Sequence, residues 1–150
     1  MTVSSLLLLH GPNLNLLGTR EPDVYGSATL SDYEAVVRDR CAASGVDFAC
    51  AQSNHEGVLV DAIHAARGVH DAILINAGAL THYSWSLHDA LKAYAGPVGE
   101  VHISNPHARE SFRRTSVIAP VAVVAVAGLG LSGYEIAASA LLALVVGRRS

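Results

Sequence analysis

Short apolar runs alternate with amphipathic stretches along the chain, and this alternation predicts strands separated by helices. Five runs are expected to be strands, and they cover Ser5–Leu9, Asp47–Ala51, Ala72–Asn76, Val98–His102 and Val121–Val126. These runs are almost continuously apolar, which is typical of strands that are buried on both faces. The pattern therefore predicts a parallel sheet with helices on each side.

The intervals between these strands carry apolar side chains at helical spacing. Helices are expected at Leu30–Ser44, Glu56–Ala66, Trp85–Ala93 and Tyr134–Val146, with a turn or two at Ala108–Arg114. Thr29 is the expected N-cap of the first, and Ser132 and Glu135 have the spacing of a capping box at the last. We expect an α/β fold, a flavodoxin-like doubly wound five-stranded parallel sheet in three α/β/α layers, as one domain over residues 1–150.

Composition narrows the classes of function. The 150 residues are 51% hydrophobic and only 15% charged, which favours a buried core over disorder. A net charge of −3 gives no electrostatic basis for binding nucleic acid. No apolar run has the length of a membrane span and no signal-peptide pattern opens the chain, so a cytoplasmic protein is expected. Cys41 and Cys50 are expected to be free, buried thiols.

Polar segments follow the first four predicted strands. They cover residues 10–26, 52–56, 76–82 and 102–106. The first presents an amide at Asn13, a guanidinium at Arg20 and a phenol at Tyr25, on a backbone interrupted by glycines and prolines. Ligands of doubly wound sheets bind at the carboxyl ends of the strands. The sequence therefore predicts a functional site at that edge.

The side chains in these segments suit the elimination of water next to a ketone, which needs a base, a stabilised enolate and an acid. Tyr25 can act as the base if a positive charge such as Arg20 favours its phenolate form. Glu100 and His102 lie two residues apart on one strand, so their side chains share a face, and the carboxylate can orient the imidazole as an acid. A packed tyrosine and a core histidine are the structural alternatives.

Other motifs carry less weight. Residues 128–133 fit G-x-G-x-x-G, but no acidic residue follows on a further strand, so a tight strand-to-helix turn is expected there. No histidine or cysteine spacing indicates a metal site. Arg109, Arg113 and Arg114 form either a solvated helix face or a site for an anionic or hydroxylated substrate. The competing classes are a flavodoxin-type binding module for a flavin or nucleotide and a phospho-acceptor domain.

Several ordered motifs resemble type II 3-dehydroquinate dehydratase, a small metal-free enzyme of the shikimate and quinate pathways. The matching stretches cover residues 10–18, 20–26, 52–57, 76–82, 100–105 and 107–114. The resemblance covers nearly the whole chain. It implies a flavodoxin-like fold, no cofactor, and a reversible anti elimination that converts 3-dehydroquinate to 3-dehydroshikimate through an enolate, without a Schiff base. The resemblance leaves open whether this step serves aromatic biosynthesis or quinate catabolism.

The resemblance also implies roles for single residues. Tyr25 would remove the proton next to the ketone, and Arg20 would keep its phenol ionised. Asn13 would hold a water that stabilises the enolate, while His102, oriented by Glu100, would protonate the leaving hydroxyl. Substrate-binding positions match Asn76, His82, Ile103, Ser104 and Arg113.

Asp89 matches an acidic residue that the family places in a neighbouring subunit's site, which implies trimers assembled into a dodecamer. The sequence departs from the family pattern around this residue. Tyr83 and Trp85 stand where a threonine and a small aliphatic residue are usual, and His88 replaces an arginine. A histidine lacks the bidentate fork of an arginine, so we expect the subunit contact and the partner of Asp89 to differ from the family pattern.

Overall fold

The computed structural model describes residues 4–147 and contains one five-stranded sheet. Its strands are β1 (Ser5–His10), β2 (Asp47–Gln52), β3 (Ala72–Asn76), β4 (Val98–His102) and β5 (Val124–Ala127). They lie in the order β2-β1-β3-β4-β5, and every neighbouring pair is parallel. This is the flavodoxin-like order, so the predicted fold class is confirmed.

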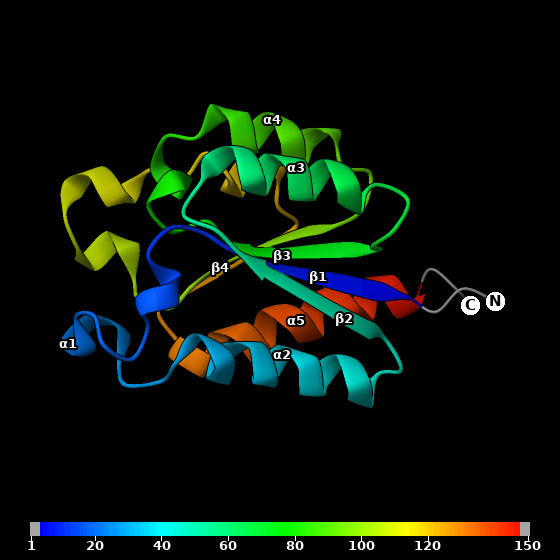
Figure 1. The fold of residues 1–150 in the computed structure, drawn as a ribbon, viewed down its shortest axis with the longest axis horizontal. Coiled ribbons are helices and arrows are strands. Elements are labelled where there is room, and N and C mark those ends of the chain that lie inside the picture. The colour runs from blue at the N-terminus through cyan, green and yellow to red at the C-terminus, as the bar shows by residue number, and fades with distance from the viewer. Residues whose placement is uncertain (1–3, 148–150) are drawn as a thin grey trace.

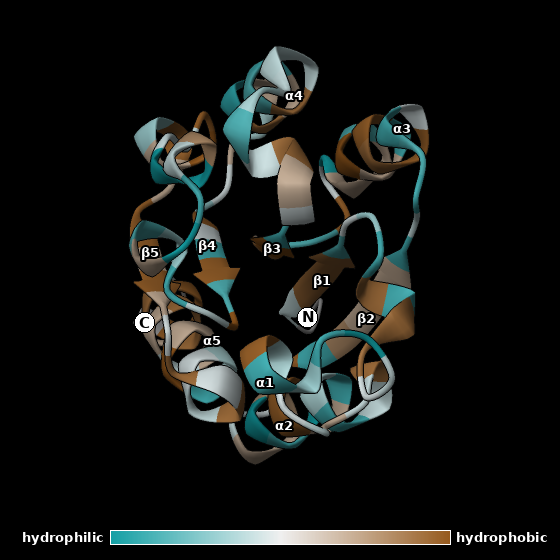
Figure 2. Ribbon diagram, turned by 90° about the vertical axis from the view of Figure 1, so that its left-hand side faces the viewer, coloured by the Kyte–Doolittle hydropathy of each residue, from teal (hydrophilic) through white to brown (hydrophobic). Residues whose placement is uncertain are grey.

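Two helices cover each face of the sheet (Figure 1). Helices α3 (Glu56–Ala66) and α4 (Trp85–Ala93) lie on one side, and α2 (Leu30–Ala43) and α5 (Gly130–Gly147) lie on the other. Side chains alternate along β1, so that Leu6 and Leu8 join the core under α2 and α5 while Leu7 and Leu9 join the core under α3 and α4. The result is the expected three-layer sandwich, with hydrophobic strands between the helices (Figure 2).

Most element predictions agree with the structure, and two boundaries are wrong. Strand β5 begins at Val124 rather than Val121, because residues Ala119–Val121 form a 3₁₀ turn, η5, that includes Pro120. Helix α5 begins at Gly130 rather than Tyr134, so Ser132 lies inside its first turn and forms no capping box. The predicted cap of α2 is confirmed, since Thr29 and Asp32 exchange capping-box hydrogen bonds.

Two local predictions have different outcomes. Gly128 and Gly130 have φ angles of 87° and 55°, which suit glycine, and they form the expected tight turn between β5 and α5. Cys41 is buried as expected, but Cys50 is exposed because its strand, β2, is at the edge of the sheet.

No helix within residues 4–147 is long and apolar enough to cross a bilayer. The domain expected over residues 1–150 extends at both ends outside the described residues.

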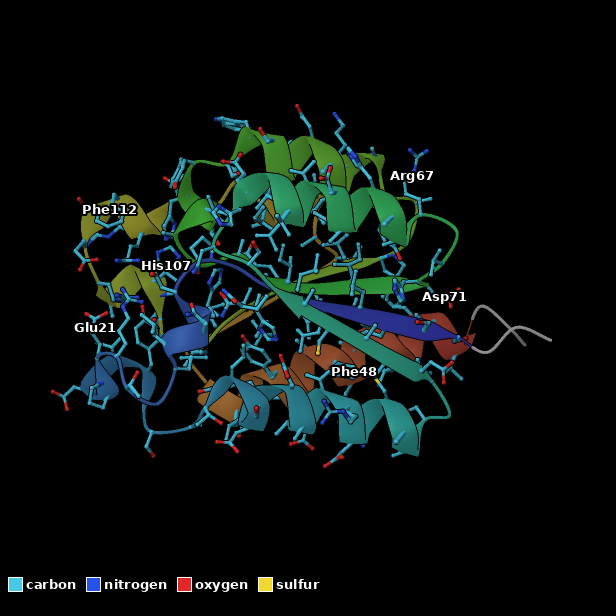
Figure 3. The ribbon with its side chains drawn as sticks, viewed as in Figure 1. Glu21, Phe48, Arg67, Asp71, His107 and Phe112 are labelled. Atoms are coloured by element: carbon cyan, nitrogen blue, oxygen red, sulfur yellow. The ribbon has the colours of Figure 1, made fainter. Side chains whose placement is uncertain are left out.

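The loops beyond the carboxyl ends of the strands gather at one end of the molecule. The segment after β1 is not a bare loop, because it contains η1 (Leu14–Leu16) and helix α1 (Pro22–Tyr25). The segment after β4 forms two further 3₁₀ turns, η3 (Pro106–Ala108) and η4 (Ser111–Arg114). Figure 3 shows Glu21 and His107 at this end and Arg67 and Asp71 at the opposite end.

Candidate active site

A pocket opens at the carboxyl end of the sheet, where the segments after β1, β3 and β4 meet. Its lining consists of Pro12, Asn13, Leu14, Arg20, Tyr25, Asn76, Gly78, Ala79, His82, His102, Ile103, Ser104, Pro106, Arg109 and Arg113. Polar side chains from three of the four predicted polar segments therefore share one cavity, and the segment after β2 does not line it. This is the edge at which a doubly wound sheet binds ligands.

Two glycines let the loops after β1 and β3 approach each other closely. A Cβ on Gly11 would lie 2.3 Å from the carbonyl oxygen of Ala77, a distance that no side chain tolerates. Gly78 has a φ of 59°, and a Cβ there would meet the Pro12 carbonyl oxygen at 3.0 Å. Asn13 also has a left-handed φ of 69°, and its backbone N–H donates to Asn54 Oδ1 at 2.9 Å. This backbone brings Asn13 to the pocket wall.

The half-buried Tyr25 is in contact with two guanidinium groups. Arg109 Nη1 donates a hydrogen bond to the Tyr25 hydroxyl oxygen at 2.9 Å. The guanidinium carbons of Arg20 and Arg109 lie 5.5 and 5.2 Å from the centre of the ring. Arg20 Nη2 also pairs with Glu21 Oε2 at 3.2 Å. The direct partner of the phenol oxygen is therefore Arg109, which the sequence reasoning had considered only as part of a basic cluster.

The side chains of Glu100 and His102 meet as their spacing on β4 predicted. Glu100 Oε1 lies 2.8 Å from His102 Nε2, and the carboxylate is almost fully buried. Its second oxygen, Oε2, accepts a hydrogen bond from Ser116 Oγ at 2.7 Å. Both carboxylate oxygens are thus fixed, and the histidine ring is held at the pocket wall.

Asn76 is held from behind by a buried tyrosine. Its Nδ2 donates to the Tyr134 hydroxyl at 2.9 Å, and its Oδ1 accepts from the Gly78 N–H at 3.1 Å. Burial raises the pKa of Tyr134, so this hydroxyl stays neutral. Because the Gly78 amide can only donate, it fixes which side of the Asn76 amide is the oxygen. Asn76 therefore lines the pocket with a defined orientation.

His10 lies beside this pair in a fully buried position. Its ring stacks on Tyr134 with 6.4 Å between centroids, and Glu34 Oε1 lies 3.4 Å from its Nε2. Within residues 4–147 neither ring nitrogen makes a hydrogen bond. Burial lowers the pKa of His10 to about 4, so the ring is neutral at pH 7.

The remaining predicted side chains divide between the pocket and the surface. His82 Nδ1–H donates to the Thr115 carbonyl oxygen at 2.8 Å, and Arg113 pairs with Glu110 at the rim. That pairing lowers the pKa of the exposed Glu110 carboxyl. Asp89 is exposed on α4 and does not line the pocket. The neighbouring His88 turns away to the Val117 carbonyl oxygen, 2.7 Å from its Nδ1.

Sequence reasoning thus found most of the pocket. Of the proposed site residues, Asp89 and Glu100 do not line the cavity, and Glu100 reaches it through His102. The contact of Arg109 with Tyr25 was missed, since it joins residues 84 positions apart. Ser116 was missed as well, and no motif marks it. Within residues 4–147 no cluster of histidine, cysteine or acidic side chains has the arrangement of a metal site.

Comparisons with known proteins agree on one family. Residues 4–142 match the family model described as dehydroquinase class II. The chain is 55% identical over 141 residues to a 3-dehydroquinate dehydratase of Ruegeria pomeroyi, which covers 94% of this chain and 95% of that one. It is 53% identical over 143 residues to catabolic 3-dehydroquinase 2 of Aspergillus flavus, with 95% of each chain covered.

A solved structure of the same family has a closely similar fold. The type II dehydroquinase of Butyrivibrio crossotus superposes with a TM-score of 0.89 at 40% sequence identity, and the match covers 93% of this chain and 97% of that one.

Proposed function

Since the chain belongs to the class II dehydroquinase family, we propose that it eliminates water from 3-dehydroquinate to give 3-dehydroshikimate, in the shikimate pathway, at the carboxyl end of its sheet. The observation that carries this proposal is a pocket lined by two proton-transfer groups, Tyr25 and His102, each held by its own partner. A hydro-lyase needs one group to take a proton and another to return one to the departing hydroxyl.

Tyr25 is the proposed base. Its oxygen already accepts a hydrogen bond from Arg109, so a positively charged group is in place when the phenol gives up its proton. The guanidinium of Arg20 lies near the same ring and adds to this field. The phenolate removes the hydrogen next to the ketone, and the electron pair of that C–H bond forms the enolate.

His102 is the proposed acid. As the enolate collapses, the bond between carbon and the hydroxyl at the β position breaks, and His102 donates a proton so that water leaves. Glu100 contacts His102 at 2.8 Å and stabilises the protonated ring before transfer. After water leaves, Tyr25 carries the abstracted proton and His102 lacks one, so the transfer of one proton from Tyr25 to His102 by way of solvent completes the cycle.

The pocket favours an enolate over an imine. Lys92 is the sole lysine of the sequence, and it is exposed on α4 outside the pocket lining. A Schiff base with the substrate ketone needs a lysine amine at the reacting carbon. Asn13 lines the pocket and is the proposed holder of the water that stabilises the enolate oxygen.

Four further pocket groups suit a hydroxylated carboxylic acid. Asn76, His82 and the Ile103–Ser104 segment supply hydrogen-bonding groups, and the guanidinium of Arg113 matches a carboxylate in charge and shape. The family assignment also supports one catalytic domain, a cytoplasmic enzyme and a dodecamer built from trimers, in which the exposed Asp89 faces a neighbouring subunit. Native mass spectrometry tests the assembly, and a monomer would contradict it.

Ultraviolet absorbance tests the function directly. Purified protein mixed with 3-dehydroquinate is expected to produce the absorbance of the conjugated enone in 3-dehydroshikimate. A folded protein that produces no enone would overturn the proposed function.

Reductive trapping tests whether the reaction passes through a Schiff base. Borohydride added with the substrate is expected to leave activity and protein mass unchanged, because no lysine amine lies at the reacting ketone. A mass increase equal to the reduced substrate would show a Schiff base instead.

A further inference from the structure

We propose that Ser116 is a positioning residue for the reaction: it holds Glu100 so that His102 keeps one hydrogen on Nε2 and delivers its acidic proton from Nδ1. This inference rests on the proposed function, in which His102 is the acid. It adds a residue outside the pocket lining and assigns the reacting atom of the ring.

The contacts of the Ser116 hydroxyl determine the direction of its hydrogen bond to Glu100. Its Oγ accepts hydrogen bonds from the backbone N–H groups of Ile118 at 3.2 Å and Ala119 at 3.0 Å. A hydroxyl has two lone pairs and one hydrogen, so both lone pairs are occupied and the hydrogen is left to donate. The remaining contact is with Glu100 Oε2 at 2.7 Å. Ser116 is therefore the donor, and Glu100 Oε2 is the acceptor.

This arrangement decides where the hydrogen lies between Glu100 and His102. Oε2 cannot carry a proton toward Ser116, because Ser116 has no lone pair free to accept it. The contact of Oε1 with Nε2 holds a single hydrogen, and an imidazole binds a proton more tightly than a carboxylate does. The hydrogen therefore resides on Nε2, and Glu100 accepts at both oxygens.

The other ring nitrogen is left for the substrate. His102 Nδ1 makes no hydrogen bond to any residue between 4 and 147, while the His102 ring lines the pocket. With Nε2 bonded to Glu100, Nδ1 is the nitrogen that gains and loses the acidic proton. Proton transfer thus runs from Nδ1 to the leaving oxygen, and the ring returns to the neutral tautomer that carries hydrogen on Nε2.

The backbone around Ser116 is rigidly placed for this task. The Val117 N–H donates to the Thr81 carbonyl oxygen at 2.8 Å, and His88 Nδ1–H donates to the Val117 carbonyl oxygen at 2.7 Å. Val117 and Ile118 are buried. His88, which departs from the family pattern, is thereby an anchor of the segment that carries Ser116. Because the Ser116 hydroxyl is held in place, it orients the Glu100 carboxylate, and that carboxylate orients the His102 ring.

Steady-state kinetics of two Ser116 variants tests the proposal. Ser116→Ala is expected to lower kcat about tenfold with KM within about twofold, since one charge-assisted hydrogen bond behind the acid is lost while the pocket lining is unchanged. Ser116→Thr keeps the hydroxyl and is expected to retain most of kcat. Loss of kcat in both Ser116→Thr and Ser116→Ala, or in neither, would overturn the proposal.

Ser84 offers a matched control. Its Oγ likewise accepts a backbone N–H, from Leu87 at 3.1 Å, and donates to a carboxylate, Glu56 Oε1, at 2.8 Å. Ser84→Ala removes the same kind of hydrogen bond at a buried place without touching His102. It is expected to lower the melting temperature but to keep kcat.

Nitrogen NMR of protein with ¹⁵N-labelled histidine rings gives a readout independent of turnover. The His102 signals, assigned by their loss in His102→Asn, are expected to show the Nε2–H tautomer in the wild type and a mixture in Ser116→Ala. An Nδ1–H tautomer in the wild type would overturn the proposal. If the wild type shows the Nε2–H tautomer but produces no enone, the proposed function fails while the hydrogen-bond arrangement stands.

Discussion

The two ends of the sheet carry similar residue types but use them differently. At the amino end, a hollow is lined by His70, Asp71 and Tyr94. There the Ser5 N–H donates to Asp71 Oδ2 at 2.8 Å, and the Tyr94 hydroxyl donates to the His70 carbonyl oxygen. Ser5 Oγ also lies 2.6 Å from His70 Nδ1, so these contacts join β1 to the segment that leads into β3. They hold the fold together.

At the carboxyl end, hydrogen-bonded side chains present reactive atoms to a cavity. Tyr25 is held by Arg109, and His102 is held by Glu100, which is held in turn by Ser116. A tyrosine or histidine can therefore take part in chemistry when its hydrogen-bond partners orient it and leave one of its atoms facing the pocket.

The largest difference is expected between two tyrosines. Tyr25→Phe removes the proposed base and should lower kcat about a thousandfold, within the usual range for general base catalysis. Tyr94→Phe removes a hydroxyl that donates to the His70 carbonyl oxygen far from the pocket, so it should keep kcat and lose about 1 kcal/mol of stability. Enone formation and thermal melts measure both. Equal activity of the two variants would contradict the proposal that Tyr25, and not Tyr94, takes part in the reaction.

His10 and His70 should differ in how much each makes the stability of the fold depend on pH. The unfolded state takes up a proton on His10 near pH 6.5, whereas burial lowers the folded pKa to about 4. The folded state is therefore favoured above pH 6.5, and about 3 kcal/mol is lost as the pH falls to 4.

His10→Asn should remove most of this slope in urea titrations between pH 7 and pH 4. Burial also lowers the pKa of His70, but that ring is only half-buried and Asp71 opposes the shift. His70→Asn should therefore keep most of the slope. An unchanged slope in His10→Asn would show that the buried ring is not its source.

Two arginines form the third pair. Arg109→Ala should lower kcat about 30-fold, because the phenolate loses a charge-assisted hydrogen bond. Arg67 is exposed beside the amino-end hollow, and Arg67→Ala should leave kcat unchanged. Steady-state kinetics at saturating substrate measures kcat for both variants. A comparable loss in both variants would point to a general charge effect rather than to the contact with Tyr25.

The smallest expected effect is on substrate binding. Tyr134→Phe leaves the Asn76 Nδ2 without its partner, so the amide loses its fixed orientation and KM should rise about tenfold with little change in kcat. Tyr33 is a buried neighbour, 4.8 Å from Tyr134 between ring centres, and Tyr33→Phe should keep KM. A fall in kcat without a rise in KM in Tyr134→Phe would contradict a binding role for Asn76.

The sequence supported much of this account because strong local patterns mark the relevant segments. Strands β3 and β4 and helices α3 and α4 have the predicted bounds, since apolar blocks between turn residues define them. The pair Glu100 and His102 followed from the two-residue period of a strand. Helix α5 was placed too late because its start depends on a turn that packs against Ile103, whose carbonyl oxygen accepts from the Gly130 N–H.

The rest depended on tertiary packing. The contact of Arg109 with Tyr25 spans 84 residues, and no spacing rule connects them. Ser116 acts through the way its segment docks on η2 (Gly78–His82), which has no local signature. The exposure of Cys50 depends on β2 being an edge strand, and strand order is a property of the whole sheet.

A crystal structure of His102→Asn with 3-dehydroquinate tests the central claim most directly, because the variant lacks the proposed acid and should retain the substrate. The account predicts the substrate in the carboxyl-end pocket, with the carbon next to its ketone about 3.5 Å or less from the Tyr25 oxygen. The leaving hydroxyl should face residue 102. Substrate bound in the hollow beside Tyr94, or turned so that its acidic hydrogen points away from Tyr25, would contradict the account.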